Sequence, residues 1–136
     1  MLSKEQLTEF LKSEFPQTKC CIEEIVNRGA TVSHKVGREE LRPGGTVSGP
    51  VLMAVADVAL YIAILSEIGL VALAVTTNLT INFLRKPSSQ KDIIGKCTLM
   101  KVGKTLIIGE VILYSEGETE PVAHVVGTYS LPPQKS

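Results

Sequence analysis

The sequence predicts an α+β domain in which an antiparallel sheet of about six strands wraps around one apolar helix. Three observations support this fold class. Residues 50–67 are apolar on every side of a helix, so this segment has to lie inside a core or a membrane. Two runs rich in β-branched residues precede it, and four longer runs follow it. A helix without a polar face is hidden from water only if the strands wrap around it.

The chain begins with a short amphipathic helix. Ser3 and Gln6 have the spacing of a capping box, which marks a helix start. Apolar residues then recur at helical spacing until Pro16, which ends the segment. We therefore expect an N-terminal helix within residues 1–16, lying on the outside of the domain because only one of its faces is apolar.

Two strands and a loop follow this helix. β-branched residues mark strands over 19–28 and 30–37, and the turn sequence 27–29 between them favours a hairpin. Residues 38–49 are rich in glycine, proline and charge, which predicts a loop that leads into the apolar helix.

The apolar helix is predicted to begin at Pro50, because proline suits the first helical position. Its one central carboxylate is Asp57. Burying an unpaired carboxylate costs several kcal/mol, so such a residue is usually paired, protonated or used in chemistry. Asp57 is therefore either a structural carboxylate that caps a buried backbone group or a catalytic one. The residues that share its helix face are otherwise apolar: Met53, Ala54, Leu60, Tyr61 and Ile64.

Four β-branched runs follow the apolar helix, and each predicts a strand. The segments between them are short and turn-like, which favours antiparallel neighbours in chain order. The strands are expected over 74–84, 92–102, 105–115 and 121–131, and a short tail over 132–136.

Length and composition narrow the class of protein. The chain has 136 residues, enough for one domain (1–136) with a core of its own. Its 14 basic and 14 acidic residues are spread along the chain, which argues against a nucleic-acid partner. The three cysteines form no CxxC pair and the N-terminus has no apolar signal region, so we expect a cytoplasmic protein. The polar residues inside segment 50–75 argue against a membrane span.

The start of the apolar helix is a second candidate for chemistry. A helix N-terminus offers unpaired amide donors, and since Pro50 has none, the Gly49 amide is the natural donor for an oxyanion. The alternative is that the two residues only start the helix. Ser48 does not fit a nucleophile elbow, which needs glycine where Thr46 stands.

Two further patterns do not indicate a binding site. Residues 102–105 resemble the end of a phosphate-binding loop, but they join two strands and are read as a hairpin turn. His34 and His124 have no cysteine or carboxylate at ligand spacing, so no metal site is expected.

Three segments together resemble a known family. They are Gly49 with an acidic residue eight positions later, Thr76–Pro87 and Lys101–Leu106. In this order they are similar to the hotdog-fold acyl-CoA thioesterases of the phenylacetate-degradation type, over about residues 20–130. The resemblance implies a long curved antiparallel sheet around one central helix, a homodimer or homotetramer with active sites at the subunit interface, an acyl-CoA substrate and no cofactor.

The resemblance also implies roles for single residues. The Gly49 amide would hold the thioester carbonyl, Asp57 would act as general base or nucleophile, and Thr76 or Thr77 would orient the attacking water. The chain departs from many members at residues 48–50, which read Ser-Gly-Pro instead of His-Gly-Gly. The remaining expected substrate contacts are Ser48, Met53, Tyr61 and Arg42 around the pocket, and Arg85, Lys101 and Lys104 for coenzyme A phosphates.

The leading hypothesis is therefore an acyl-CoA thioesterase. Two alternatives stay open: a hotdog protein that binds acyl-CoA without hydrolysing it, and a hydratase or dehydratase. The latter chemistry normally pairs a histidine with the acid.

Overall fold

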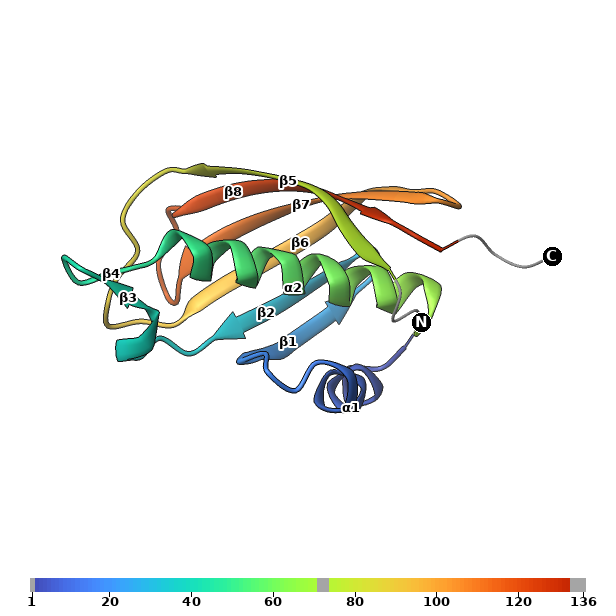
Figure 1. The fold of residues 1–136 in the computed structure, drawn as a ribbon, viewed down its shortest axis with the longest axis horizontal. Coiled ribbons are helices and arrows are strands. Elements are labelled where there is room, and N and C mark those ends of the chain that lie inside the picture. Colours follow the sequence, from blue (N-terminus) through green and yellow to red (C-terminus); the bar gives the residue numbers. More distant parts are fainter. Residues whose placement is uncertain (1, 71–73, 133–136) are drawn as a thin grey trace.

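The computed structural model describes residues 2–70 and 74–132; the tail expected at 132–136 lies outside the described residues except for Pro132. Two helices and eight strands make up this part of the chain (Figure 1). In chain order they are α1 (Lys4–Glu14), β1 (Cys20–Val26), β2 (Gly29–His34), the 3-10 turn η1 (Arg38–Glu40), β3 (Leu41–Arg42), β4 (Thr46–Val47), α2 (Gly49–Ile68), β5 (Val75–Phe83), β6 (Ile93–Val102), β7 (Leu106–Ser115) and β8 (Ala123–Ser130).

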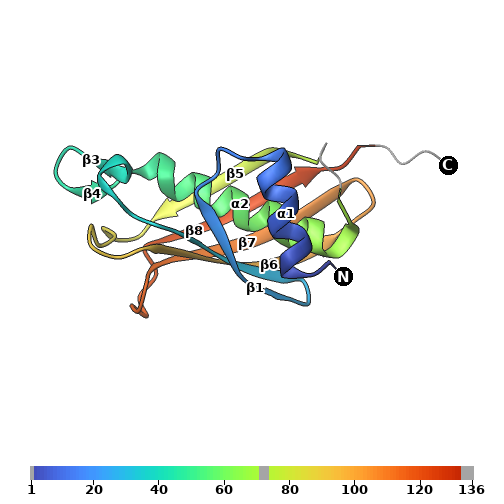
Figure 2. The ribbon, with the colours of Figure 1, turned by 90° about the horizontal axis from the view of Figure 1, so that it is seen from below.

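The main sheet has six antiparallel strands in the order β1-β2-β6-β7-β8-β5. It curves around α2, while α1 lies beside β1 at one edge (Figures 1 and 2). The predicted α+β class, the central helix and the short N-terminal helix are thus confirmed. The capping box is also present: the Ser3 hydroxyl accepts from the Gln6 amide at 3.1 Å, and the Gln6 side chain accepts from the Ser3 amide at 2.9 Å.

One prediction about strand order is wrong. β6–β7 and β7–β8 are neighbours as expected, but β5 does not pair with β6. Instead β6 pairs with β2, and β5 pairs with β8 at the opposite edge. This order brings the strands from before and after α2 into one sheet, which curves around one face of the helix (Figure 1). The connection between β5 and β6 crosses the sheet rather than making a turn.

Glycines on the concave face let α2 lie close to the sheet. Gly109 and Gly127 face each other across β7 and β8. A Cβ atom on either would come within 2.5 Å and 2.4 Å, respectively, of the buried Leu60 side chain. The Leu60 methyl groups therefore occupy the space that two side chains would fill, and eleven of the twenty α2 residues are buried. By length and composition α2 could cross a membrane, but core helices have the same properties, and here it is packed against the sheet.

The segment expected as a loop over 38–49 contains more structure than predicted. It forms η1 and then the small antiparallel ribbon β3–β4. Ser48 is the N-cap of α2, and its hydroxyl accepts from the Val51 amide at 3.4 Å. The helix therefore starts at Gly49, one residue before the predicted proline.

Candidate active site

Asp57 lies in the middle of α2, and one of its two carboxylate oxygens is held by hydrogen bonds. Its Oδ1 atom accepts hydrogen bonds from the Thr76 hydroxyl at 2.6 Å and the Tyr129 hydroxyl at 2.7 Å. Within the described residues no hydrogen bond reaches Oδ2. The carboxylate is therefore held in one orientation while one oxygen keeps its lone pairs for another partner.

A β-bulge decides which threonine reaches Asp57. The register of β5 on β8 shifts between Thr76 and Asn78, so Thr77 has no partner residue in β8. The Thr77 hydroxyl donates to the Thr128 carbonyl at 3.2 Å instead. The resemblance allowed either threonine, and the structure brings Thr76 to the carboxylate and turns Thr77 to the neighbouring strand.

Tyr129 is a site residue that the sequence reasoning missed. It comes from β8, far from α2 in sequence, and its side chain is buried. Burial, followed by the nearby Asp57 charge, raises the pKa of its phenol, so the group stays protonated and can donate. The available signal was that an inward-facing tyrosine in the predicted strand 121–131 needs a partner for its hydroxyl.

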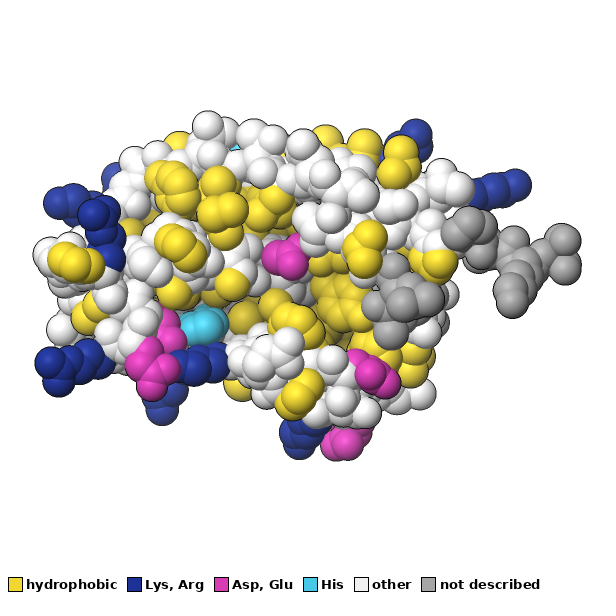
Figure 3. Space-filling model, in the orientation of Figure 1, with side chains coloured by type: hydrophobic (Ala, Val, Ile, Leu, Met, Phe, Trp, Pro, Cys, Tyr) yellow, Lys and Arg dark blue, Asp and Glu magenta, His cyan; other side chains and the backbone are white. Residues whose placement is uncertain are grey.

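An open cavity of about 390 Å³ with aromatic walls lies on one side of Asp57; we call it the aromatic cavity. Tyr61 and Tyr129 stack there with ring centroids 6.1 Å apart. Phe15, at the end of α1, closes another side. The lining residues are Glu14, Phe15, Asp57, Val58, Tyr61, Ala74, Val75, Thr76 and Tyr129. Figure 3 shows hydrophobic side chains around a hollow on this face, with acidic side chains and a histidine near it.

The structure also places the other predicted pocket residue, Met53. It lies on the exposed surface of α2, one helical turn before Asp57, and its side chain is not among those lining the aromatic cavity. Tyr61 and Asp57 thus line the same cavity, whereas Met53 lies on the exposed face of the helix outside that cavity.

A second open cavity, of about 330 Å³, also has Asp57 in its wall. Its wall contains His34 and Glu40, whose Nε2 and Oε2 atoms are 3.3 Å apart. The His34 Nδ1 atom lies 3.7 Å from the Cys20 sulfur. These neighbours of His34 were not predicted, because Cys20 and Glu40 come from other elements. Within the described residues, no group of three or more His, Cys, Asp or Glu side chains could hold a metal.

Glu40 has a strongly favoured charged form. Its carboxylate accepts from the Gly37 amide at 2.7 Å, and Lys19 and His34 donate to its other oxygen at 3.1 and 3.3 Å. The Gly37 hydrogen bond, followed by those from Lys19 and His34, lowers the pKa of Glu40 from 4.5 to about 2, although burial opposes the shift.

This lowered pKa predicts how Glu40 contributes to acid stability. A carboxylate whose pKa is lower in the folded state stabilises the fold above the unfolded pKa and loses that effect as pH falls toward the folded value. We expect Glu40→Gln to lower the free energy of unfolding by about 1 to 3 kcal/mol at pH 7. The difference from wild type should shrink between pH 4.5 and about 2. Urea unfolding across this range measures it, and a difference that stays constant would contradict the assignment.

A third open cavity, of about 440 Å³, lies at the start of α2; we call it the basic cavity. It is lined by Gly49, Phe83 and three cations: Arg42, Arg85 and Lys86. No acceptor among the described residues takes the Gly49 amide. The Phe83 ring lies 3.2 Å from the position a Cβ of residue 49 would occupy, which is why glycine fits here.

The predicted cations do not all lie together. Arg42 and Arg85 line the basic cavity, but Lys101 and Lys104 belong to the β6–β7 hairpin at the other end of the molecule (Figure 1). Ser48, the remaining predicted contact, serves as the N-cap. Arg42 forms no ion pair with Glu39 or Glu40, both of which bind Lys19 instead.

Gly49 and Asp57 are too far apart to act on one small group within a single chain. Eight residues of helix separate them by about 12 Å along the axis. An oxyanion donor has to lie about 3 Å from the oxygen it stabilises. A carbonyl held at Gly49 is therefore out of reach of Asp57 in the same chain.

Comparison with known proteins identifies relatives. The model of the thioesterase superfamily matches residues 44–122. A predicted thioesterase from a Silicibacter species is similar over 98% of this chain and 94% of its own, with 43% identity and a TM-score of 0.91. No curated protein matches the sequence.

Two more distant structures share the fold. The E. coli PaaI protein from the phenylacetic acid degradation operon has 20% identity and a TM-score of 0.75, covering 93% of this chain and 90% of its own. A hypothetical thioesterase with coenzyme A from Streptococcus pneumoniae has 21% identity and a TM-score of 0.76, covering 98% and 100%. The arrangement of the sheet around α2 is the hotdog fold.

Proposed function

Because the chain belongs to the thioesterase superfamily, we propose that it is an acyl-CoA thioesterase, which hydrolyses a thioester to a free acid and coenzyme A. The observation that carries the proposal is the Asp57 carboxylate, which lines two cavities, with Oδ1 held by two hydroxyl donors and Oδ2 free within the described chain. A fixed carboxylate beside an apolar cavity suits the activation of water next to an acyl group.

In the proposed reaction, Asp57 Oδ2 removes a proton from water as the water oxygen bonds to the thioester carbonyl carbon. The Gly49 amide donates to the developing oxyanion. The C–S bond then breaks, and the departing thiolate of coenzyme A takes up a proton. In the second route, Oδ2 attacks the carbonyl itself and water later hydrolyses the mixed anhydride. Both routes need the carboxylate in the same place.

We propose that the site forms between two copies of the chain. The separation of Gly49 and Asp57 within one helix supports this, since two antiparallel α2 helices would bring Gly49 of one copy to Asp57 of the other. The edge strand β5 supports the same idea, because among the described residues it pairs only with β8 and its other edge has no partner strand. Its Val75 and Phe83 side chains are each 55% exposed, and such edges favour pairing. A homodimer or homotetramer is expected.

The basic cavity is proposed to bind phosphates of coenzyme A. Arginine forks suit phosphate oxygens, and Arg42 and Arg85 lie beside the proposed oxyanion donor Gly49. We expect Arg42→Ala and Arg85→Ala each to raise KM about tenfold, because each variant loses one charge-assisted hydrogen bond to the substrate. The value of kcat should stay nearly unchanged. Initial-rate kinetics of thiol release measure this effect.

Lys101→Ala and Lys104→Ala are the matched controls for these variants. They remove the same charge from the opposite end of the molecule and should leave KM unchanged. If all four variants raise KM equally, the effect comes from net charge and not from the basic cavity.

The aromatic cavity is proposed to hold the acyl group. The stacked rings of Tyr61 and Tyr129 offer a flat apolar surface beside Asp57, which suits an aromatic or medium-length acyl group. This agrees with a role of the phenylacetate-degradation type. We propose that the protein acts in a reducing compartment, the cytoplasm, because its three cysteines are free.

The test is thiol release from short, medium, long and aromatic acyl-CoAs by the purified protein, followed with a thiol-reactive dye. Release from at least one class supports a thioesterase and identifies its acyl group. Saturable binding by calorimetry without release would instead support a binding protein. Hydration of an enoyl-CoA without thiol release would support a hydratase. The histidine for that reaction would be His34, which lines the same cavity as Asp57.

A further inference from the structure

Glu40 is a buried carboxylate that the proposed reaction does not use. Only 6% of its surface is exposed, although it lies in the turn η1 between the sheet and the start of α2. Its three donors come from three separate segments: Lys19 precedes β1, His34 ends β2, and Gly37 begins the turn. Such a set of partners fixes one residue from several directions at once.

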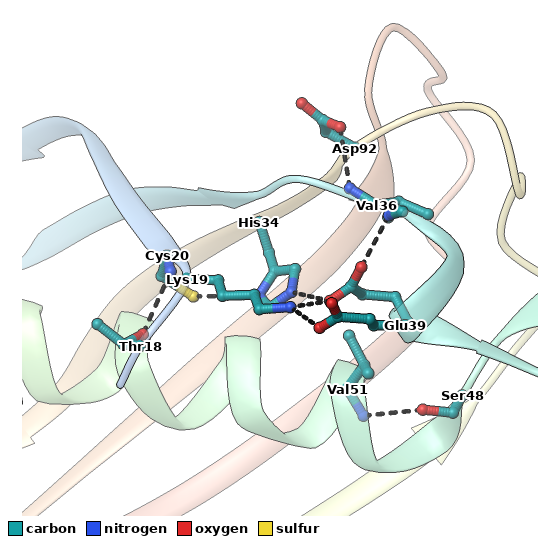
Figure 4. Close-up of polar contacts among 11 residues, drawn as sticks. Thr18, Lys19, Cys20, His34, Val36, Glu39, Ser48, Val51 and Asp92 are labelled. Atoms are coloured by element: carbon teal, nitrogen blue, oxygen red, sulfur yellow. Dashed lines mark hydrogen bonds and ion pairs between the residues drawn. The ribbon is translucent and has the colours of Figure 1, made fainter. Parts of the chain in front are cut away.

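The donors also restrain each other. An ionised carboxylate only accepts hydrogen bonds. His34 Nε2 therefore carries a proton and donates a hydrogen bond to Glu40 Oε2. In the neutral imidazole Nδ1 then accepts from the Cys20 thiol, whose pKa burial raises to about 11. Lys19 binds Glu39 as well as Glu40. Figure 4 shows Lys19, His34 and Glu39 converging between the strands and the turn.

The main chain of Glu40 connects this cluster to the helix start. The Glu40 carbonyl accepts from the Ser48 amide at 2.9 Å. Ser48 is the N-cap of α2, and the next residue is Gly49. The side chain of Glu40 is thus bound to the sheet side, and its backbone to the residue before the proposed oxyanion donor. The ribbon β3–β4 closes the short loop between these two points.

We propose that Glu40 is a positioning residue, which holds the Gly49 amide in place by anchoring η1 to the sheet and the Ser48 amide to η1. The kinetic part of this proposal rests on the proposed thioesterase function. Displacing an oxyanion donor by about 1 Å costs up to a hundredfold in rate. The loop between the two anchored points also carries Arg42, so we expect the same displacement to weaken coenzyme binding as well.

The chain provides a matched control, because it contains a second His–Glu pair. His124 Nε2 lies 2.9 Å from Glu110 Oε2, on β8 and β7, with neither residue in contact with the loop before α2 in any hydrogen bond of the described chain. Glu40→Gln and Glu110→Gln therefore each remove one charge that faces a histidine. Only Glu40→Gln removes the carboxylate that anchors the loop before α2.

Two measurements test the proposal. For Glu40→Gln we expect kcat for an acyl-CoA that the wild type hydrolyses to fall about tenfold or more, whereas Arg42→Ala should raise KM and leave kcat nearly unchanged. We also expect hydrogen exchange to become about tenfold faster in peptides covering residues 44–52, and to stay unchanged in residues 60–68 of the same helix. Glu110→Gln should change neither quantity. Lys19→Met, which removes a half-exposed donor, should give a smaller change in the same direction and serves if Glu40→Gln does not fold.

Two results would overturn the proposal. One is unchanged exchange in residues 44–52 of Glu40→Gln or, failing that, of Lys19→Met. The other is an equal fall in kcat for Glu40→Gln and Glu110→Gln. If the wild type releases no thiol from any acyl-CoA, the proposed function fails, whereas the exchange comparison still decides whether Glu40 anchors the helix start.

Discussion

Replacing Asp57 by asparagine is expected to lower kcat/KM for thioester hydrolysis by about a hundred to ten thousandfold, the usual effect of removing a general base. The amide oxygen can still accept from Thr76 and Tyr129, so the local hydrogen bonds survive. The amide nitrogen takes the place of Oδ2, where it has no basic lone pair and is no nucleophile. The variant should therefore fold normally and lose only its chemistry.

Thiol release by Asp57→Asn measures this loss, and circular dichroism and size-exclusion chromatography check the fold and the assembly. Glu110→Gln is the control, since Glu110 is a carboxylate on β7 that lines none of the three cavities. It should retain nearly full activity. Activity of Asp57→Asn above about a tenth of wild type would exclude Asp57 as base or nucleophile.

The second large effect concerns the contact between α2 and the sheet. Gly127→Ala is expected to lower the free energy of unfolding by about 1 to 3 kcal/mol, because its methyl group overlaps the buried Leu60 side chain. Leu60→Ala alone should cost about 2 to 5 kcal/mol through the cavity that it leaves. In the double variant the new methyl group fills part of that cavity. The double variant should therefore lose less free energy of unfolding than the two single variants together, by about 1 kcal/mol or more.

Chemical denaturation of the four proteins in this cycle gives the coupling. Gly103→Ala is the control, because a Cβ at Gly103 would lie 2.8 Å from the main-chain carbonyl of Leu106 instead of a side chain. Leu60→Ala should not relieve that overlap. Additive losses for Gly127 and Leu60 would contradict the close packing of the helix on the glycines.

The hydrogen-bond partners of Asp57 show what a sequence pattern leaves open. Asp57 itself was identifiable, because a carboxylate in an apolar helix is unusual whatever surrounds it. Tyr129 was not, since β8 reaches α2 only through a sheet order in which β5 crosses to the far edge. The choice of Thr76 over Thr77 depends on a bulge, which inserts one residue into the alternation and is not visible in the composition of the strand.

The sequence by itself determined the elements and their class. Local periodicity, capping residues and turn residues act over a few positions, so they identify α1, α2 and the strands without knowledge of their partners. Only the tertiary structure decided the strand order, the Glu40–His34–Cys20 contacts and the separation of Arg42 and Arg85 from Lys101 and Lys104. These depend on long-range pairing, which is set by how a curved sheet encloses an apolar helix and not by neighbours in the chain.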